Sequence, residues 1–335
     1  MMYLMIAGGL VLLFVGGEGL VRGSVSVARK LNISELVIGL TLVGFGTSVP
    51  ELVTSLQAVD RGAVGIAVGN VVGSNIANVL LVLALAAILS PIVIQRGAIG
   101  RDGMVMTGVT ALLCGLLWFD QFGRIVGFVL VALLIAYLAI SLILDQRRQD
   151  AAAAMHAGEG EIVEAQYGLV AGLLIAAAGL AGVVIGANLL VEGSVSLARS
   201  VGISETVIGL TIVAIGTSLP ELATSVVAAL RGRADVAFGN VIGSNIFNIL
   251  GILGLTALIK PFSVRVGEGA GGEAVSLISG VDIITLVLSV ALLMLFAFTA
   301  RRITRWEGAV LLTGYCLYMG IIFNIVPVPA ILQNV

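Results

Sequence analysis

Two hydrophobic stretches of this chain carry the same polar motif, separated by a constant 170 residues. GFGTSVPELVTS and GNVVGSNIAN, within residues 44–78, recur as AIGTSLPELATS and GNVIGSNIFN, within residues 214–248. An ungapped alignment of residues 23–91 with 193–261 gives roughly 40 identities in 69 positions. Each copy places a glutamate, a proline and several Ser, Thr and Asn residues inside an otherwise apolar run. The chain is therefore a duplication, and we expect its halves to share one fold.

The composition indicates an all-α integral membrane protein. Hydrophobic residues make up 59% of the 335 residues and charged residues 11%, and the mean hydropathy is +1.17, which excludes a soluble globular protein. With 44 glycines and 6 prolines, the chain suits closely packed helices that break locally. We expect ten membrane-spanning helices, near residues 3–21, 34–58, 63–89, 102–118, 124–144, 167–190, 204–229, 234–259, 281–299 and 306–325.

The ten expected spans divide into two five-helix repeats. The first repeat is residues 1–144, a polar cytoplasmic linker follows at 145–166, and the second repeat is residues 167–335. Because five is odd, the second repeat enters the membrane from the opposite face, and the two repeats are inverted. With both termini outside, 12 of the 17 Lys and Arg residues fall in cytoplasmic loops and 5 in outer loops. This distribution predicts a multi-pass protein of the plasma (inner) membrane with both termini outside.

Each copy of the motif predicts a broken helix at the membrane midplane that carries a carboxylate. Pro50 and Pro220 remove a backbone donor and free carbonyls one turn earlier. Glu51 and Glu221 follow directly. The polar side chains near them all offer oxygen: Thr47, Ser48, Ser74 and Asn78 in the first copy, and Thr217, Ser218, Ser244 and Asn248 in the second.

An all-oxygen set of this kind suits Ca²⁺ and Na⁺ and does not suit Zn²⁺ or copper. Each Ser, Thr or Asn taken alone is explained equally well by a hydrogen bond that it forms between helices as by a bound cation. For the glutamates that explanation is weaker, because an unpaired carboxylate at membrane depth is costly and a bound cation compensates it. Glu35 and Glu205 each follow a serine at a helix start, so we expect them to stabilise helix termini.

At these residues the chain resembles the cation/calcium antiporters, in particular the short prokaryotic sodium/calcium exchangers, whose two α-repeats are similar to GTSxPE and GSNxxN. The resemblance implies a Ca²⁺ site formed by the carboxylates of Glu51 and Glu221 with the carbonyls of Thr47 and Thr217. It implies one Na⁺ site toward the inside, at Gly44, Thr47, Ser48, Glu51 and Ser74. It implies a second toward the outside, at Ala214, Thr217, Ser218, Glu221 and Ser244. Asn78 and Asn248 would flank a central position.

The sequence departs from this family at two positions. Asn248 stands where some relatives carry aspartate, which leaves two carboxylates at the centre, and Ala214 takes the place that corresponds to Gly44. The function implied is antiport of Ca²⁺ against Na⁺ by alternating access; Ca²⁺/H⁺ exchange and K⁺-dependent exchange are the alternatives.

Other classes of protein fit the motifs poorly. A serine hydrolase needs a general base, and no His or Lys accompanies Ser48 or Ser218. A passive channel does not need inverted repeats with broken helices around one site. We therefore expect a transporter and not an enzyme, with no cofactor. The expected partners are Ca²⁺, Na⁺ and the lipid bilayer, without nucleic acid, and the sequence does not tell which proteins, if any, bind this one.

Overall fold

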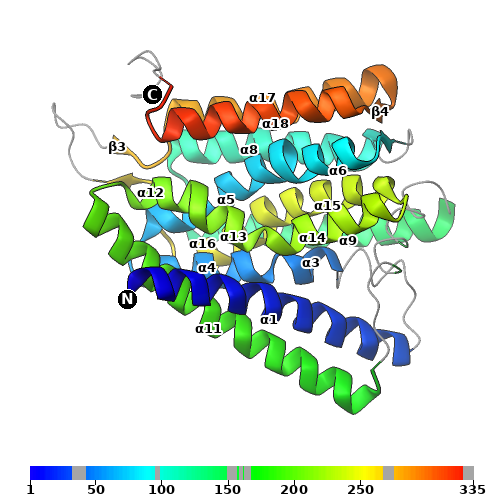
Figure 1. Cartoon of the computed structure of the whole chain (residues 1–335), viewed down its shortest axis with the longest axis horizontal. Coiled ribbons are helices and arrows are strands. Elements are labelled where there is room, and N and C mark those ends of the chain that lie inside the picture. Colours follow the sequence, from blue (N-terminus) through cyan, green and yellow to red (C-terminus); the bar gives the residue numbers. More distant parts are fainter. Residues whose placement is uncertain are drawn as a thin grey trace.

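A computed structural model of the chain describes residues 1–31, 43–94, 99–148, 157, 161, 167–266 and 275–326. Its elements are helices that run roughly parallel to one long axis, with a few two-residue strands at the ends (Figure 1). The first half contains α1 (Met2–Lys30), α3 (Gly44–Thr47), α4 (Val49–Asp60), α5 (Val64–Ala77), the π-helix η2 (Asn78–Leu83), α6 (Ala84–Leu89), β1 (Ile92–Val93), the π-helix η3 (Ile99–Gly103), α8 (Met104–Phe119) and α9 (Arg124–Arg148).

The second half repeats the order of the main helices and differs in its strands. It contains α11 (Leu169–Val201), α12 (Glu205–Ile208), the π-helix η4 (Gly209–Val213), α13 (Ala214–Thr217), α14 (Leu219–Leu230), α15 (Ala234–Ile246), the π-helix η5 (Phe247–Leu253), α16 (Gly254–Ile259), β2 (Arg265–Val266), β3 (Val275–Ser276), α17 (Gly280–Ala300), β4 (Arg302–Ile303) and α18 (Arg305–Ile322).

The chain is a helical membrane protein. Within the described ranges, seven helices are long and apolar enough to cross a bilayer, or eight if a bent pair, Glu205–Thr217 with Leu219–Leu230, counts as one span. The expected span 34–58 lies partly outside the described residues, and the expected span 306–325 corresponds to α18, which is not among the seven. Helices α1 and α11 extend further than the apolar runs 3–21 and 167–190, because their polar C-terminal turns continue beyond the length that a bilayer needs.

Burial separates central helices from peripheral ones. In an apolar 18-residue stretch of each helix, 83% of the residues of Val64–Leu89 and 78% of those of Ala234–Ile259 are buried, against 33% for α1 and 22% for α11. The central spans hold the GSNxxN segments, so the second half of each motif lies in the core. Apolar side chains on the peripheral helices, such as Val11 and Leu174, are exposed, as expected of surfaces that face lipid.

Helices α1 and α11 pack against each other in antiparallel directions through paired glycines (Figure 1). A Cβ on Gly9 would lie 2.8 Å from the carbonyl oxygen of Gly186, and a Cβ on Gly16 would lie 2.8 Å from that of Gly179. Small residues at this spacing let two backbones touch, which is a common way to join helices in lipid. We therefore regard α1 and α11 as one closely packed pair.

Each GTSxPE motif breaks its helix at the serine. Ser48 (φ −89°, ψ 3°) separates α3 from α4, and Ser218 (φ −82°, ψ 9°) separates α13 from α14. Pro50 and Pro220 occupy the first turn of the new helix, where a missing N–H costs nothing, and the second pair is bent by 45°. The predicted breaks are therefore present in both halves, and each lies within one turn of its glutamate.

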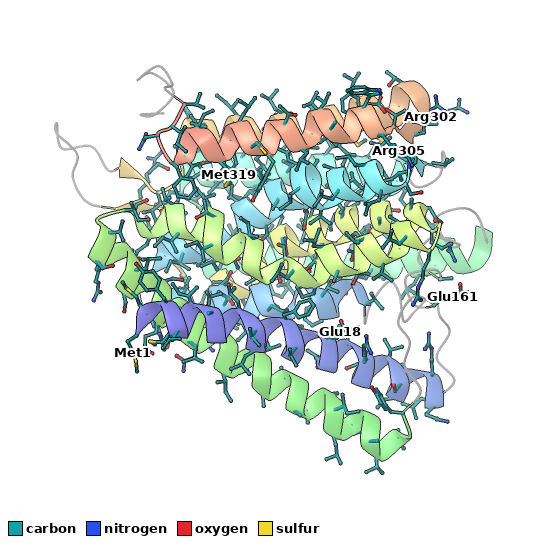
Figure 2. The ribbon with its side chains drawn as sticks, in the orientation of Figure 1. Met1, Glu18, Glu161, Arg302, Arg305 and Met319 are labelled. Carbon is teal, nitrogen blue, oxygen red and sulfur yellow. The ribbon has the colours of Figure 1, made fainter. Side chains whose placement is uncertain are left out.

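Loop contacts define two ends of the molecule. At the first, which we call the Arg61 end, Lys260 contacts Asp60 and Ser263 contacts Asp120. At the second, which we call the Arg231 end, β1 pairs with β4 and Arg305 donates to the carbonyl of Leu89. Figure 2 shows Arg302 and Arg305 at this end and Met1 at the opposite one.

Helix starts near the ends carry side-chain caps. Ser204 accepts a hydrogen bond from the amide of Val207, which agrees with the helix start expected at Ser204 and Glu205. The corresponding start at Glu35 lies outside the described residues. So do residues 267–274, most of a Gly-rich insert (VGEGAGGEAV, 266–275) of about ten residues that the first half lacks. Most of the expected linker 145–166 lies outside them as well.

Candidate cation site between the two copies of the motif

The carboxylates of Glu51 and Glu221 lie together at the centre of the protein, both with no exposed surface. Each accepts a hydrogen bond from the serine of the other copy: Ser218 Oγ lies 3.2 Å from Glu51 Oε1, and Ser48 Oγ lies 3.2 Å from Glu221 Oε1. The second oxygen of each carboxylate, Oε2, is buried and has no hydrogen-bond partner among the described residues. Two carboxylates thus converge from two copies, each with a free oxygen.

Asn70 and Asn240 hold the backbone of the two glutamates in the same way. The Nδ2 of each donates to the carbonyl of the glutamate in its own copy at 3.2 Å, and to Ser55 Oγ or Ser225 Oγ at 3.0 Å. We had not assigned these asparagines from the sequence. The signal was present, because each is the asparagine of the duplicated GNVVG or GNVIG segment.

The residues just before each break differ in their contacts. Thr47 Oγ1 and Ser48 Oγ lie 3.4 and 3.5 Å from the carbonyl oxygen of Gly44. Thr217 Oγ1 instead contacts Asn70 Oδ1 at 3.0 Å, as well as the carbonyls of Val213 and Ala214 at 3.0 and 3.4 Å. The carbonyls of Gly44 and Ala214 therefore both face hydroxyl groups at the break.

Ser74 and Ser244 also contact different groups. Ser244 Oγ lies 3.4 Å from Oε1 of Glu221, in its own copy. Ser74 Oγ lies 3.4 Å from the carbonyl oxygen of Ala214, in the other copy. Ser74 thus contacts the backbone of the second copy, and its place in a Na⁺ site with Glu51 stays a prediction.

Asn78 and Asn248 lie one helical turn beyond these serines and are buried. Asn78 Nδ2 donates to Asn245 Oδ1 at 3.0 Å, and its Oδ1 has no partner among the described residues. For Asn248 neither the amide nitrogen nor the oxygen has one. Both asparagines lie in π-helices, η2 and η5, a helix form that is frequent at functional sites.

Five buried side-chain oxygens of the residues described above therefore lack partners within the described ranges: Glu51 Oε2, Glu221 Oε2, Asn78 Oδ1, Asn240 Oδ1 and Asn248 Oδ1. Buried polar atoms are normally paired, so a set of this size points to a ligand. Carboxylate and amide oxygens are ligands for hard cations. The described residues contain no cluster of three or more His, Cys, Asp or Glu, in keeping with a centre that has two carboxylates.

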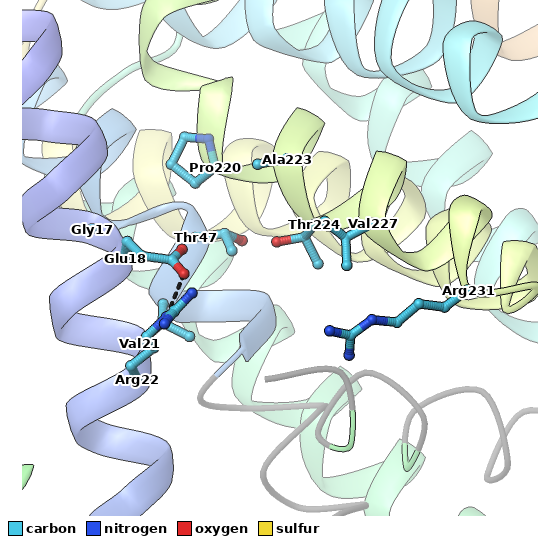
Figure 3. Close-up of a pocket in the computed structure, with 10 residues that line it drawn as sticks. All are labelled: Gly17, Glu18, Val21, Arg22, Thr47, Pro220, Ala223, Thr224, Val227 and Arg231. Carbon is cyan, nitrogen blue, oxygen red and sulfur yellow. Dashed lines mark hydrogen bonds and ion pairs between the residues drawn. The ribbon is translucent and has the colours of Figure 1, made fainter. Parts of the chain in front are cut away.

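A cavity of about 160 Å³ leads from the Arg231 end toward this centre. Figure 3 shows Glu18 and Arg22 of α1 on one side of it, Arg231 on the other, and Thr47 and Pro220 at its base. The cavity thus connects one end of the molecule with the residues of both helix breaks.

Two buried aspartates form a second duplicated feature, which we did not predict. Tyr137 donates to Asp102 Oδ1 at 3.1 Å, joining α9 to η3, and Tyr318 donates to Asp282 Oδ1 at 2.8 Å, joining α18 to α17. The two aspartates are 180 residues apart, so the Gly-rich insert displaces them from the 170-residue register. The tyrosines are 181 residues apart, so an alignment needs one gap to pair the aspartates and a second, of one residue, to pair the tyrosines.

Comparison with known proteins identifies the family. A model described as sodium/calcium exchanger protein matches residues 1–143 and 171–324. The chain belongs to the sodium/calcium exchanger family. Its halves meet at the two glutamates.

Several relatives are similar over nearly the whole length of the chain. The sodium/calcium exchanger MaX1 of Methanosarcina acetivorans is 35% identical over 355 residues, which cover 96% of this chain and 99% of that protein. The putative antiporter CaxA of Alkalimonas amylolytica is 36% identical, covering 94% of this chain and 97% of the relative. A solved structure of the sodium-calcium exchanger NCX_Mj, soaked with Na⁺ and Sr²⁺, is 34% identical with a TM-score of 0.61, covering 96% of this chain and 97% of that one.

These relatives are exchangers and not enzymes, and the chain is accordingly a multi-pass membrane transporter of the cation/Ca²⁺ exchanger type. The expectations of family and transport class are confirmed.

Proposed function

We propose that the protein exchanges Ca²⁺ for Na⁺ across the membrane by alternating access. One observation carries this proposal: two fully buried carboxylates, one from each copy of the motif, meet with their Oε2 atoms free of partners among the described residues. Two negative charges offset the two positive charges of Ca²⁺. The same charges without a cation are costly at membrane depth, so some cation must occupy the site during most of the cycle.

The Ca²⁺ site comprises Glu51 and Glu221 with the carbonyls of Thr47 and Thr217. Two Na⁺ sites overlap it, one at each helix break. The first consists of Gly44, Thr47, Ser48, Glu51 and Ser74, and the second of Ala214, Thr217, Ser218, Glu221 and Ser244. Asn78 and Asn248 lie at the central position, and their partnerless amide oxygens support this assignment. Because the serines bond to the glutamate of the opposite copy, one cation would contact both copies.

The architecture that we propose is ten spans in two inverted five-helix repeats, residues 1–144 and 167–335, joined by a cytoplasmic linker at 145–166. The antiparallel packing of α1 against α11 supports inversion, because these are the first helices of the two repeats. Described Arg and Lys residues gather at the Arg231 end: Arg22, Arg29, Lys30, Arg101, Arg231, Arg233, Arg301, Arg302 and Arg305. We therefore assign the Arg231 end to the cytoplasm and both termini to the outside of the plasma (inner) membrane.

K⁺-dependent exchange is the second candidate. The sodium/potassium/calcium exchanger 5 of Homo sapiens is 36% identical, but over 116 residues, which cover 34% of this chain and 22% of that protein. By contrast, MaX1 matches throughout. Coupling to Na⁺ alone is therefore the better supported function.

Uptake of radioactive Ca²⁺ into proteoliposomes tests the proposed coupling. Purified protein is reconstituted, and the vesicles are loaded with Na⁺, with K⁺, or at a different pH from the bath. We expect only an outward Na⁺ gradient to drive strong uptake, with or without external K⁺. Uptake that follows the pH gradient, or that needs K⁺ together with Na⁺, would contradict the proposal.

The orientation has a separate test with single cysteines in a background that lacks Cys114 and Cys316. Ser263→Cys, at the Arg61 end, should react with an impermeant thiol reagent applied to intact cells. Arg302→Cys, at the Arg231 end, should react only after the membrane is opened. The opposite pattern would invert the assignment.

A further inference from the structure

The two ends of the molecule differ although they contain corresponding residues. At the Arg61 end, the guanidinium of Arg61 donates to the Asn188 side chain and, at 3.4 Å, to the Asn188 carbonyl, and it lies 3.8 Å from the Glu192 carboxylate. Gln57 Nε2 donates to the carbonyl of Val184 at 3.1 Å. Together these contacts join the end of α4 to α11. We call the contacts of Arg61 and Gln57 with α11 the outer latch.

The corresponding residues at the other end are 170 positions away. Arg231 matches Arg61, Glu18 matches Asn188, and Arg22 matches Glu192. The register extends through α1 and α11, because Gly9 and Gly16 match Gly179 and Gly186. At this end α14 and α1 are parted by the cavity, and Glu18 is paired at 2.5 Å with Arg22 of its own helix (Figure 3).

A deeper layer shows the same difference. Thr217 Oγ1 contacts Asn70 Oδ1 at 3.0 Å on the closed side. Of the corresponding pair, Thr47 lines the cavity and Asn240 Oδ1 is buried with no partner among the described residues. Thr54 has no exposed surface, whereas its counterpart Thr224 lines the cavity. Both the contacts near the surface and those of the deeper layer are therefore formed at the Arg61 end and absent at the Arg231 end.

We propose that Arg61 and Arg231 are gating residues that latch alternate ends of the molecule during transport. In the state of this structure, the outer latch holds the Arg61 end closed. In the opposite state Arg231 pairs with Glu18 and Thr47 pairs with Asn240, while Arg61 releases α11 and Thr217 releases Asn70. Since α1 and α11 are one closely packed pair, closing one end against them opens the other. This inference relies on the alternating access of the proposed function and adds the residues that control it.

The two latches are not equal in composition. We call the contact of Arg231 with α1 in the opposite state the inner latch. Val227 takes the place of Gln57 and cannot donate a hydrogen bond, so the inner latch lacks that contact. Glu18 takes the place of Asn188 and supplies a charge, but Arg22 competes with Arg231 for it. Removing Arg22 should therefore favour closure of the Arg231 end, whereas removing Arg231 should disfavour it.

Thr54 and Thr224 provide a matched pair of reporter positions. Thr54→Cys or Thr224→Cys is introduced into protein that lacks Cys114 and Cys316, and the purified protein is labelled without Ca²⁺ or Na⁺ by a charged thiol reagent. Rates are normalised to the labelling of denatured protein. Because an exposed ion pair changes an equilibrium by only a few fold, we expect Arg61→Ala to raise the rate at Thr54→Cys about threefold and lower it at Thr224→Cys. Arg231→Ala should do the reverse, and Arg22→Ala should act like Arg61→Ala.

Neighbouring charges supply the controls. Lys260→Ala removes the surface contact with Asp60 beside Arg61, and Arg233→Ala removes the contacts with Glu161 and Asp235 beside Arg231. Neither Lys260→Ala nor Arg233→Ala should change the labelling rate at Thr54→Cys or at Thr224→Cys. If Arg61→Ala does not fold, Gln57→Ala removes the second outer contact and should act in the same direction.

Unchanged rates in the Arg61 and Arg231 variants, or a change in the same direction at both reporter positions, would overturn the proposal. The readout is accessibility and not transport, so it does not depend on which cations the protein carries. A failure of the latch and a failure of Na⁺/Ca²⁺ coupling are therefore distinguishable.

Discussion

The two copies of the motif share two contacts of their glutamates and differ in the contacts of the residues around them. Each glutamate accepts a hydrogen bond at 3.2 Å from the serine of the other copy, and each glutamate carbonyl accepts one at 3.2 Å from an asparagine of its own copy. By contrast, Thr217 contacts Asn70, and Thr47 has no corresponding contact with Asn240.

This difference agrees with two separate roles, cation binding at the centre and the opening of one end by the residues that flank it. In the proposed mechanism the centre offers the same two charges to the cation whichever end is open, which agrees with the matched serine and asparagine contacts of the two glutamates. The flanking layers differ in this mechanism, because only one end is open to solvent at a time. A nearly identical sequence thus adopts two local arrangements.

The largest expected effect tests the symmetric centre. Glu51→Gln and Glu221→Gln should each reduce Na⁺-driven Ca²⁺ uptake at least about 100-fold, since the amide keeps the size of the side chain and loses the charge that offsets Ca²⁺. Glu205→Gln changes a first-turn acid outside the centre and is the control, with uptake near that of the native protein. If one of the two glutamates can be neutralised with little loss, the two copies are not equivalent.

A smaller effect is expected at the serines that cross between copies. Ser48→Ala and Ser218→Ala each remove one hydrogen bond to a carboxylate, and such bonds contribute about 1.5–3 kcal/mol. We expect the Ca²⁺ concentration for half-maximal uptake to rise roughly tenfold in both variants, and equally. Ser194→Ala removes a buried hydroxyl without a partner among the described residues and should leave it unchanged. Unequal effects of the two crossing serines would show that the centre is asymmetric too.

The smallest expected effect concerns the contact of Thr217 with Asn70, which the corresponding pair, Thr47 and Asn240, does not form. A double-mutant cycle of Thr217→Val with Asn70→Ala, measured by unfolding in SDS without Ca²⁺ or Na⁺, should give a coupling free energy of about 1 kcal/mol. The corresponding cycle of Thr47→Val with Asn240→Ala should give a value near zero, because those groups do not meet in this state. Equal couplings would mean that the resting protein does not favour the state described.

The helix breaks and the buried glutamates could be predicted from the sequence. A proline inside an apolar run predicts a helix break, and a glutamate there predicts a functional carboxylate. Both residues occur in each copy of the motif. The cap at Ser204 was equally local and was predicted correctly. These features depend on residues within one or two turns of each other, which is the range over which sequence patterns are informative.

Contacts between the copies could not be predicted. Ser48 and Ser218 reach the glutamate of the opposite copy, and Ser74 reaches Ala214, because of how the broken helices pack. Nor could the asymmetry be predicted, since residues that are identical in both copies, such as Thr47 and Thr217, cannot indicate which copy is open. The Asp282–Tyr318 contact was missed for a simpler reason, because an insertion removed it from the constant register.

The central claim is that the two glutamates together form one Ca²⁺ site and not two. Equilibrium binding of radioactive Ca²⁺ to the purified protein, with and without Na⁺, tests this claim most directly. We predict one Ca²⁺ per chain, displaced by Na⁺, and complete loss of binding in both Glu51→Gln and Glu221→Gln. Two Ca²⁺ per chain, with half the binding retained in each variant, would contradict the account.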